Sequence, residues 1–250
     1  MTIAAEGSLP FVPYPRRRFI RSILRGLIGV GLGALCNLKV EGLENFPRTG
    51  PVLMVCNHFS FIDPVAVIRF SPRHVEFIGG TQTPNAPKAV GWISKVYGVL
   101  PVRRGSLTRD SLLGAQSLLN QGGVLGIFPE AGSWAKVLRP ARPGAALLAS
   151  RTRALILPVG LTGLTNLFPS IRKGKRGTVT IRVGKPFGPF YVSERGENDR
   201  KKLDEMGHEI MRQIAAMLPP EERGYYSDDP QIRLAAAGTE IYPWANKAEE

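Results

Sequence analysis

The sequence predicts an α/β fold in which a mixed, mostly parallel sheet is flanked by helices and preceded by an N-terminal amphipathic helical segment. Short apolar runs rich in β-branched residues alternate along the chain with longer segments of helical periodicity, as they do in α/β proteins. Several runs end in a polar residue or a glycine, which is typical of strand ends that bind ligands. With 250 residues and 43% hydrophobic content, the chain is long enough for one sizeable core.

The strand candidates are short, apolar and bounded by turn residues. They lie near residues 52–56, 75–78, 99–102, 124–128, 155–160 and 179–183. Helical patterns lie near residues 64–70, 88–96, 108–121, 142–151 and 198–217. The expected parts are a basic amphipathic N-terminal segment over residues 1–38, an α/β domain over 39–218, and an extended C-terminal tail over 219–250, where the composition turns acidic and turn-rich.

A histidine and an aspartate follow the first strand candidate, in the segment NHFSFID at residues 57–63. A carboxylate fixed near an imidazole can accept its Nδ1 proton and leave Nε2 as a general base. His58 and Asp63 are therefore candidate catalytic residues. The alternative for Asp63 is structural, because an aspartate followed by Pro64 is also typical of a helix N-terminus.

Two further strand candidates end in charged residues and glycines. The segment GVLPVRRG at residues 98–105 contains Arg103 and Arg104, and GIFPEAGS at residues 126–133 contains Glu130 and Gly132. Polar groups at successive strand ends describe the ligand-binding edge of an α/β sheet. Taken singly, the two arginines also fit a solvated turn, and Glu130 fits an acid stabilised by a helix dipole.

Taken in this order, the segments resemble the motifs of the glycerolipid acyltransferase family, most closely those of its 1-acylglycerol-3-phosphate acyltransferases. The matching blocks are NHxxxxD at 57–63, GxxPVxRG at 98–105, FPE at 128–130 and an apolar PV at 158–159, and the resemblance covers about residues 38–217. The third family block usually continues Glu-Gly-Thr-Arg, whereas Ser133 stands here in place of that arginine. This departure leaves the identity of the acceptor open.

The resemblance implies transfer of a fatty acyl group from a thioester, either acyl-CoA or acyl-carrier protein, to the free hydroxyl of lysophosphatidic acid, with no bound cofactor. It implies that His58 is the base and that Asp63 orients it. Cys56 lies inside a strand candidate, and no serine or cysteine is placed as an evident nucleophile, so we expect direct transfer without an acyl-enzyme. The expected substrate-binding residues are Arg103, Arg104, Glu130, Gly132, Arg139 and Arg142, the last two as replacements for the missing arginine.

The chain is strongly basic, with a formal net charge of +13. No acidic residue occurs from Ala131 to Ser193, so this block attracts anions: lipid phosphates, the donor's nucleotide, an acidic carrier protein or nucleic acid. It lacks interleaved aromatic residues and any recognisable nucleic-acid module, so no nucleic acid is expected, although a basic nucleic-acid-binding protein is the alternative from another class. Another lyso-lipid and glycerol 3-phosphate are the alternative acceptors. No metal-binding motif is evident.

The N-terminal segment is predicted to associate with a membrane without crossing it. Five arginines at positions 16, 17, 18, 21 and 25 interleave with apolar residues. The uncharged stretch that follows, residues 26–38, has 13 residues, fewer than the roughly 20 that span hydrocarbon. A basic amphipathic helix of this kind lies on an anionic lipid surface, here the cytoplasmic face. A signal peptide and a helix buried under the domain are the alternatives.

Overall fold

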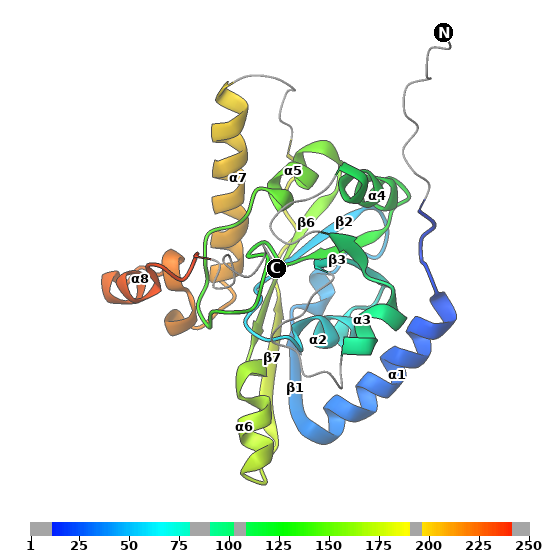
Figure 1. Ribbon diagram of the computed structural model, residues 1–250, viewed down its shortest axis with the longest axis vertical. Coiled ribbons are helices and arrows are strands. Elements are labelled where there is room, and N and C mark those ends of the chain that lie inside the picture. The colour runs from blue at the N-terminus through cyan, green and yellow to red at the C-terminus, as the bar shows by residue number, and fades with distance from the viewer. Residues whose placement is uncertain (1–11, 81–90, 103–108, 191–196, 242–250) are drawn as a thin grey trace, which may run out of the picture.

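The computed structural model describes residues 12–80, 91–102, 109–190 and 197–241. These residues form a seven-stranded sheet of order β1-β7-β6-β2-β5-β3-β4 (Figure 1). Neighbouring strands are parallel except β6 and β7, which are antiparallel. The prediction of a mixed, mostly parallel sheet is confirmed. The strands are β1 (Cys36–Glu41), β2 (Val52–Cys56), β3 (Val75–Gly80), β4 (Leu100–Val102), β5 (Val124–Ile127), β6 (Leu155–Thr162) and β7 (Gly177–Val183).

Helices cover both faces of the sheet, and each face has its own apolar core. On β2, alternate side chains enter the two cores, because successive residues of a strand point to opposite faces. Every residue of β2 is buried, which explains its unbroken apolar sequence. One face carries α1 (Arg18–Leu35), α2 (Asp63–Phe70), α3 (Gly91–Tyr97) and α6 (Leu167–Arg172), and the other carries α4 (Arg109–Asn120), α5 (Gly144–Arg151) and α7 (Glu197–Ala215).

The strand β1 was missed by the sequence prediction, which placed a boundary at residue 38, inside it. β1 is an edge strand that pairs with β7 alone, so its residues alternate between packed and exposed positions. Its first residues therefore read as the end of the preceding apolar run. β1 is the first strand of the sheet along the chain, and α1 is joined directly to it.

The C-terminal residues up to 241 are not an extended tail, contrary to the prediction. They form two short 3-10 helices, η4 (Pro220–Glu222) and η5 (Gly224–Tyr226), and the helix α8 (Pro230–Ala236). The amide of Leu138 donates to the carbonyl of Glu222 at 2.9 Å, and the amide of Tyr225 donates to the carbonyl of Leu138 at 3.0 Å. These backbone pairs hold the segment against the domain. No local sequence pattern signals them, because the partners lie more than 80 residues apart.

The helix α1 packs through Leu24 and Leu32 and leaves a second apolar face open. Phe19, Leu27 and Val30 on that face are 77%, 62% and 76% exposed. In the described part of the chain, no helix combines the length and the hydropathy needed to cross a bilayer. One arginine of this segment departs from the prediction, because Arg21 is buried inside the protein and does not face solvent.

Candidate active site

The candidate site lies where β2 and β5 end side by side. The two strands are parallel and in register, with Val55 opposite Ile127, so the segments that follow them leave the sheet at the same edge. Asn57 fixes the end of β2 to the neighbouring β6: its Nδ2 donates to the carbonyl of Leu161 at 2.9 Å, and the amide of Leu161 donates to its Oδ1 at 2.7 Å. His58, the next residue, therefore begins at a fixed point.

The side chains of His58 and Asp63 are in contact, as the spacing predicted. Nδ1 of His58 lies 2.9 Å from Oδ2 of Asp63. The same oxygen accepts the amides of Phe59 and Ser60, each at 2.8 Å. Burial raises the pKa of Asp63, and the contacts with the histidine and the two amides partly offset that effect. Asp63 thus binds two amides that precede it and closes the loop before α2. It is therefore not a simple helix N-cap, which would bind amides inside the helix.

The imidazole of His58 stacks on Phe128, with the ring centroids 4.2 Å apart. Phe128 in turn stacks on Phe77 of β3. The His58 side chain keeps 17% of its surface exposed, whereas Asp63 keeps 2%. Within the described residues, nothing hydrogen-bonds to Nε2 of His58. The ring is therefore held at Nδ1 by Asp63 and on one face by Phe128, and Nε2 is available.

Glu130 holds the backbone of His58. Its Oε1 accepts the amide of His58 at 2.7 Å, and its Oε2 accepts Nε of Arg139 at 3.2 Å. Burial raises the pKa of Glu130 to about 7, although Arg139 and the His58 amide both act in the opposite direction. Glu130 is buried, and its contact with His58 is to the backbone amide.

Arg139 is committed to this internal pair, which differs from its predicted use on an acceptor phosphate. The side chain is 2% exposed, and a second nitrogen donates to the carbonyl of Gly132. The guanidinium lies 3.8 Å from the centroid of the Trp134 ring. That ring also explains Gly132, since a Cβ on this residue would lie 2.1 Å from a ring carbon of Trp134. The glycine makes room for an aromatic side chain of the protein.

The remaining predicted substrate-binding residues are placed differently. Arg142 is exposed, its amide donates to the carbonyl of Pro129 at 2.8 Å, and its guanidinium reaches the carbonyl of Glu240 at 3.4 Å. Arg103 and Arg104 lie outside the described residues. The sequence prediction gave no role to Asn57 or to Phe128, although both belong to the quoted motifs.

The arrangement is suited to removing a proton from a hydroxyl group. A histidine with one nitrogen held by a carboxylate presents the other as a base, and the carboxylate stabilises the imidazolium that forms. Cys56 directly precedes Asn57, but its thiol is buried and burial raises its pKa, which disfavours the reactive thiolate. Within the described residues, no cluster of histidine, cysteine, aspartate and glutamate side chains is suited to a metal ion.

The chain is similar to proteins of known sequence and structure. A chloroplastic 1-acyl-sn-glycerol-3-phosphate acyltransferase of Arabidopsis thaliana is 30% identical over 193 residues, 74% of this chain and 53% of the relative. The 1-acyl-sn-glycerol-3-phosphate acyltransferase of Bacillus subtilis is 24% identical over 150 residues, 60% of this chain and 73% of the relative. The crystal structure of the 1-acyl-sn-glycerophosphate acyltransferase from Thermotoga maritima has the same fold, with a TM-score of 0.56, 22% identity, and coverage of 78% of this chain and 79% of that one.

The chain spans about half the length of the plant relatives that it matches. The match to the family model named acyltransferase extends over residues 37–162, from β1 to the end of β6. That region includes His58, Asp63, Glu130 and Arg139, together with the strands that place them. On this match, which covers half of its residues, the chain belongs to the acyltransferase family.

Proposed function

We propose that this protein transfers a fatty acyl group from a thioester donor to the free hydroxyl of lysophosphatidic acid, which gives phosphatidic acid. The observation that carries the proposal is the pair of His58 and Asp63 at the end of β2, with Nε2 of the imidazole unpaired among the described residues. The names of the plant and bacterial relatives support the choice of lysophosphatidic acid as the acceptor.

In the proposed reaction, Nε2 of His58 takes the proton of the acceptor hydroxyl as its oxygen attacks the thioester carbonyl carbon. The new ester C–O bond forms, the C–S bond breaks, and the imidazolium returns the proton to the departing thiolate. A positioned base of this kind contributes roughly 10²- to 10⁴-fold in rate. Asp63 stabilises the imidazolium, and Glu130 fixes the backbone of His58, which makes Glu130 a positioning residue.

For the acceptor phosphate, Arg104 is our first choice, with Arg103 and Arg142 as further candidates. A guanidinium binds a phosphate monoester through two hydrogen bonds. Arg142 is exposed beside the site, whereas Arg139 is occupied by Glu130. Ser133 in place of the family arginine keeps another lyso-lipid or glycerol 3-phosphate as the second candidate acceptor.

We further propose that the protein works on a membrane surface, at the cytoplasmic face, where acyl-CoA and acyl-carrier protein are present. The exposed apolar face of α1 supports this, since Phe19, Leu27 and Val30 form an exposed apolar strip on one helix. The net charge of +13 favours a surface of anionic headgroups.

The test is acyl transfer from labelled acyl-CoA and acyl-carrier protein to a panel of lyso-lipids, with wild type, His58→Ala and His74→Ala compared. His74 is a matched control because it lies outside the motif segments. We expect transfer to lysophosphatidic acid in wild type and His74→Ala, and its loss in His58→Ala. Transfer that persists without His58 would refute the base, and transfer to another acceptor alone would replace lysophosphatidic acid.

A further inference from the structure

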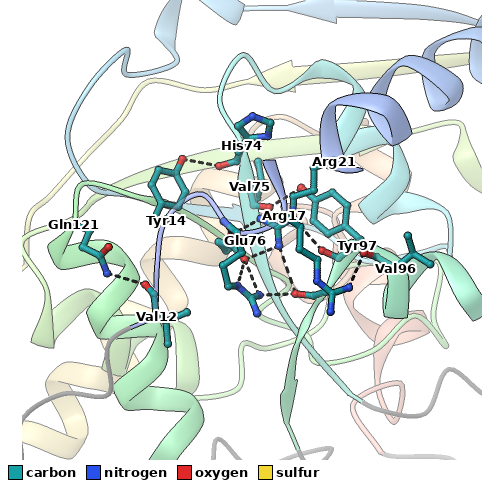
Figure 2. Close-up of polar contacts among 12 residues, drawn as sticks. Val12, Tyr14, Arg17, Arg21, His74, Val75, Glu76, Val96, Tyr97 and Gln121 are labelled. Atoms are coloured by element: carbon teal, nitrogen blue, oxygen red, sulfur yellow. Dashed lines mark hydrogen bonds and ion pairs between the residues drawn. The ribbon is translucent and has the colours of Figure 1, made fainter. Parts of the chain in front are cut away.

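The chain that precedes α1 lies across several elements of the sheet before the helix begins. Nε2 of Gln121, next to the end of α4, donates to the carbonyl of Val12 at 2.8 Å. The hydroxyl of Tyr14 donates to the carbonyl of His74 at 2.7 Å, just before β3 (Figure 2). This segment therefore runs from one helical layer to the other and delivers α1 to the face that carries α3.

Three arginines at the start of α1 hold the C-terminal end of α3. Nη1 of Arg17 donates to the carbonyls of Lys95 and Val96, both at 2.9 Å. Nε of Arg21 donates to the carbonyl of Tyr97 at 3.0 Å (Figure 2). Nη2 of Arg16 donates to the carbonyl of Gly98 at 2.5 Å. Four consecutive carbonyls, 95 to 98, thus accept hydrogen bonds from side chains of one distant segment, whereas the last carbonyls of a helix have no partner within the helix itself.

Glu76 of β3 supplies the opposite charge and is fully buried. Its Oε2 accepts Nη2 of Arg16 at 2.7 Å and Nη2 of Arg21 at 2.8 Å. The guanidinium of Arg21 also lies over the ring of Tyr97, 4.4 Å from its centroid. Because Glu76 sits in the strand that pairs with β4, the arginines are fixed to the same strand pair. We call Arg16, Arg17, Arg21 and Glu76 the arginine grip.

The arginine grip is more than a support for α1. The helix already packs through Leu24 and Leu32, and β1 anchors its far end. Arg17 is exposed and has a positive φ of 49°, a backbone conformation that costs a non-glycine residue about 1–3 kcal/mol. In this conformation its side chain reaches two carbonyls of α3 at a surface position. Arg17 therefore holds the last turn of α3, directly before the turn that leads to β4.

We propose that the arginine grip positions the turn before β4 and thereby sets the affinity for the acceptor. β4 begins at Leu100, two residues after the last carbonyl that the grip holds, and Arg103 and Arg104 follow it in the sequence. The inference rests on the proposed function, in which these two arginines bind the acceptor phosphate. Loss of the grip weakens acceptor binding, while His58 and its partners at the end of β2 continue to act as a base.

The test compares Arg17→Gln with Arg18→Gln. The two neighbours lose the same charge from the same end of α1, but among the described residues the only side-chain hydrogen bond that involves Arg18 is the one its carbonyl accepts from Oγ of Ser22. With a short-chain lysophosphatidic acid below its micelle concentration, Arg17→Gln is expected to raise the KM for the acceptor roughly tenfold, the size expected for losing hydrogen bonds from a charged donor. Its kcat and its KM for the donor stay near wild type. Arg18→Gln is expected to match wild type in all three.

Amide hydrogen exchange gives a second readout that needs no activity. In Arg17→Gln and in Glu76→Gln, the amides of Gly98, Val99 and Leu100 are expected to exchange faster, whereas Arg18→Gln leaves them unchanged. Glu76→Gln leaves Arg21 buried without its carboxylate, so the Arg17 pair decides the question if that variant does not fold. Equal behaviour of Arg17→Gln and Arg18→Gln in both assays would overturn the proposal. If wild type transfers no acyl group at all, the proposed function is wrong, and so is the proposed effect on acceptor affinity. The exchange comparison still decides whether the arginine grip holds the turn.

Discussion

Two buried glutamates pair with arginines in this protein, and they act on different parts of it. Glu130 accepts the amide of His58 and one guanidinium, so it is tied to the backbone of the proposed base. Glu76 accepts two guanidiniums from the start of α1 and lies behind the turn into β4. A glutamate–arginine pair thus holds the backbone of the proposed base in one place, and a second such group holds the turn before the proposed acceptor-binding arginines in the other. Changes near Glu130 should therefore appear in kcat, and changes near Glu76 in the KM for the acceptor.

The largest expected effect is that of Asp63→Asn on kcat. The asparagine oxygen can still accept the amides of Phe59 and Ser60, which bind the same atom that faces Nδ1 of His58, but an uncharged amide gives the imidazolium no charged partner. We expect kcat to fall roughly 10²- to 10⁴-fold with little change in the KM for the acceptor. The measurement is steady-state transfer to lysophosphatidic acid, with the exposed Asp228→Asn as the control. A loss confined to the KM for the acceptor would mean that Asp63 acts in acceptor binding and not on the proposed base.

Glu130→Gln should lower the free energy of unfolding by about 3 kcal/mol, because its oxygen can still accept the His58 amide while its NH2 group cannot accept Nε of Arg139, which stays buried without an acceptor. Replacing Arg139 by leucine in the same chain removes that unpaired charge, so the double variant should regain much of the stability. Urea unfolding of both variants measures this, with the exposed Glu205→Gln as the control. A double variant no more stable than Glu130→Gln would show that the ion pair is not the reason for the loss.

The pH dependence of stability gives a smaller and more specific test of Glu130. Burial raises its pKa to about 7 in the folded protein, above the ordinary value near 4.3 of the unfolded chain. The folded state then binds the proton more tightly, so this contribution is fully present below about pH 4.3 and is lost as the pH rises through about 7. The stability of wild type relative to Glu130→Gln should therefore decrease from pH 5 to pH 8, by about 1.4 kcal/mol per unit of pKa difference. Unfolding curves at four pH values measure it, and a difference that stays flat or increases would contradict the sign.

The two glutamates also differ in how far the sequence could predict them. Glu130 was identified because it follows an apolar strand within a motif. Its position near His58 follows from two parallel strands that end at the same edge of the sheet. Glu76 lies within the strand sequence VEFIGG and resembles one polar residue of an ordinary strand. Its partners are 55 and 60 residues away, and such tertiary pairs leave no local signal.

The same limit explains the other departures from the sequence prediction. Arg139 was expected at the acceptor because its charge was visible, whereas its burial against Trp134 was not. Arg21 was grouped with headgroup-binding arginines for the same reason. Local periodicity predicted the six strands β2 to β7 and the main helices, since each carries its own pattern. The edge strand β1 and the folded segment around α8 depend on distant partners and were missed.

The smallest expected effect concerns Gly132, whose carbonyl accepts a hydrogen bond from Arg139, the residue that also donates to Glu130. A methyl group there would lie 2.1 Å from a carbon of the Trp134 ring, so the ring must move away from Arg139. We expect Gly132→Ala to destabilise the fold by about 1–3 kcal/mol, as overpacking does. The control is Gly31→Ala on α1, where nothing lies within 4 Å of the added methyl and alanine should stabilise the helix by about 0.5–1 kcal/mol. Thermal unfolding of the two variants measures both signs. Because Trp134 stacks on Arg139 and Arg139 holds Glu130, kcat should fall together with stability in Gly132→Ala; an unchanged kcat in a destabilised variant would separate Trp134 from the chain of contacts that reaches His58.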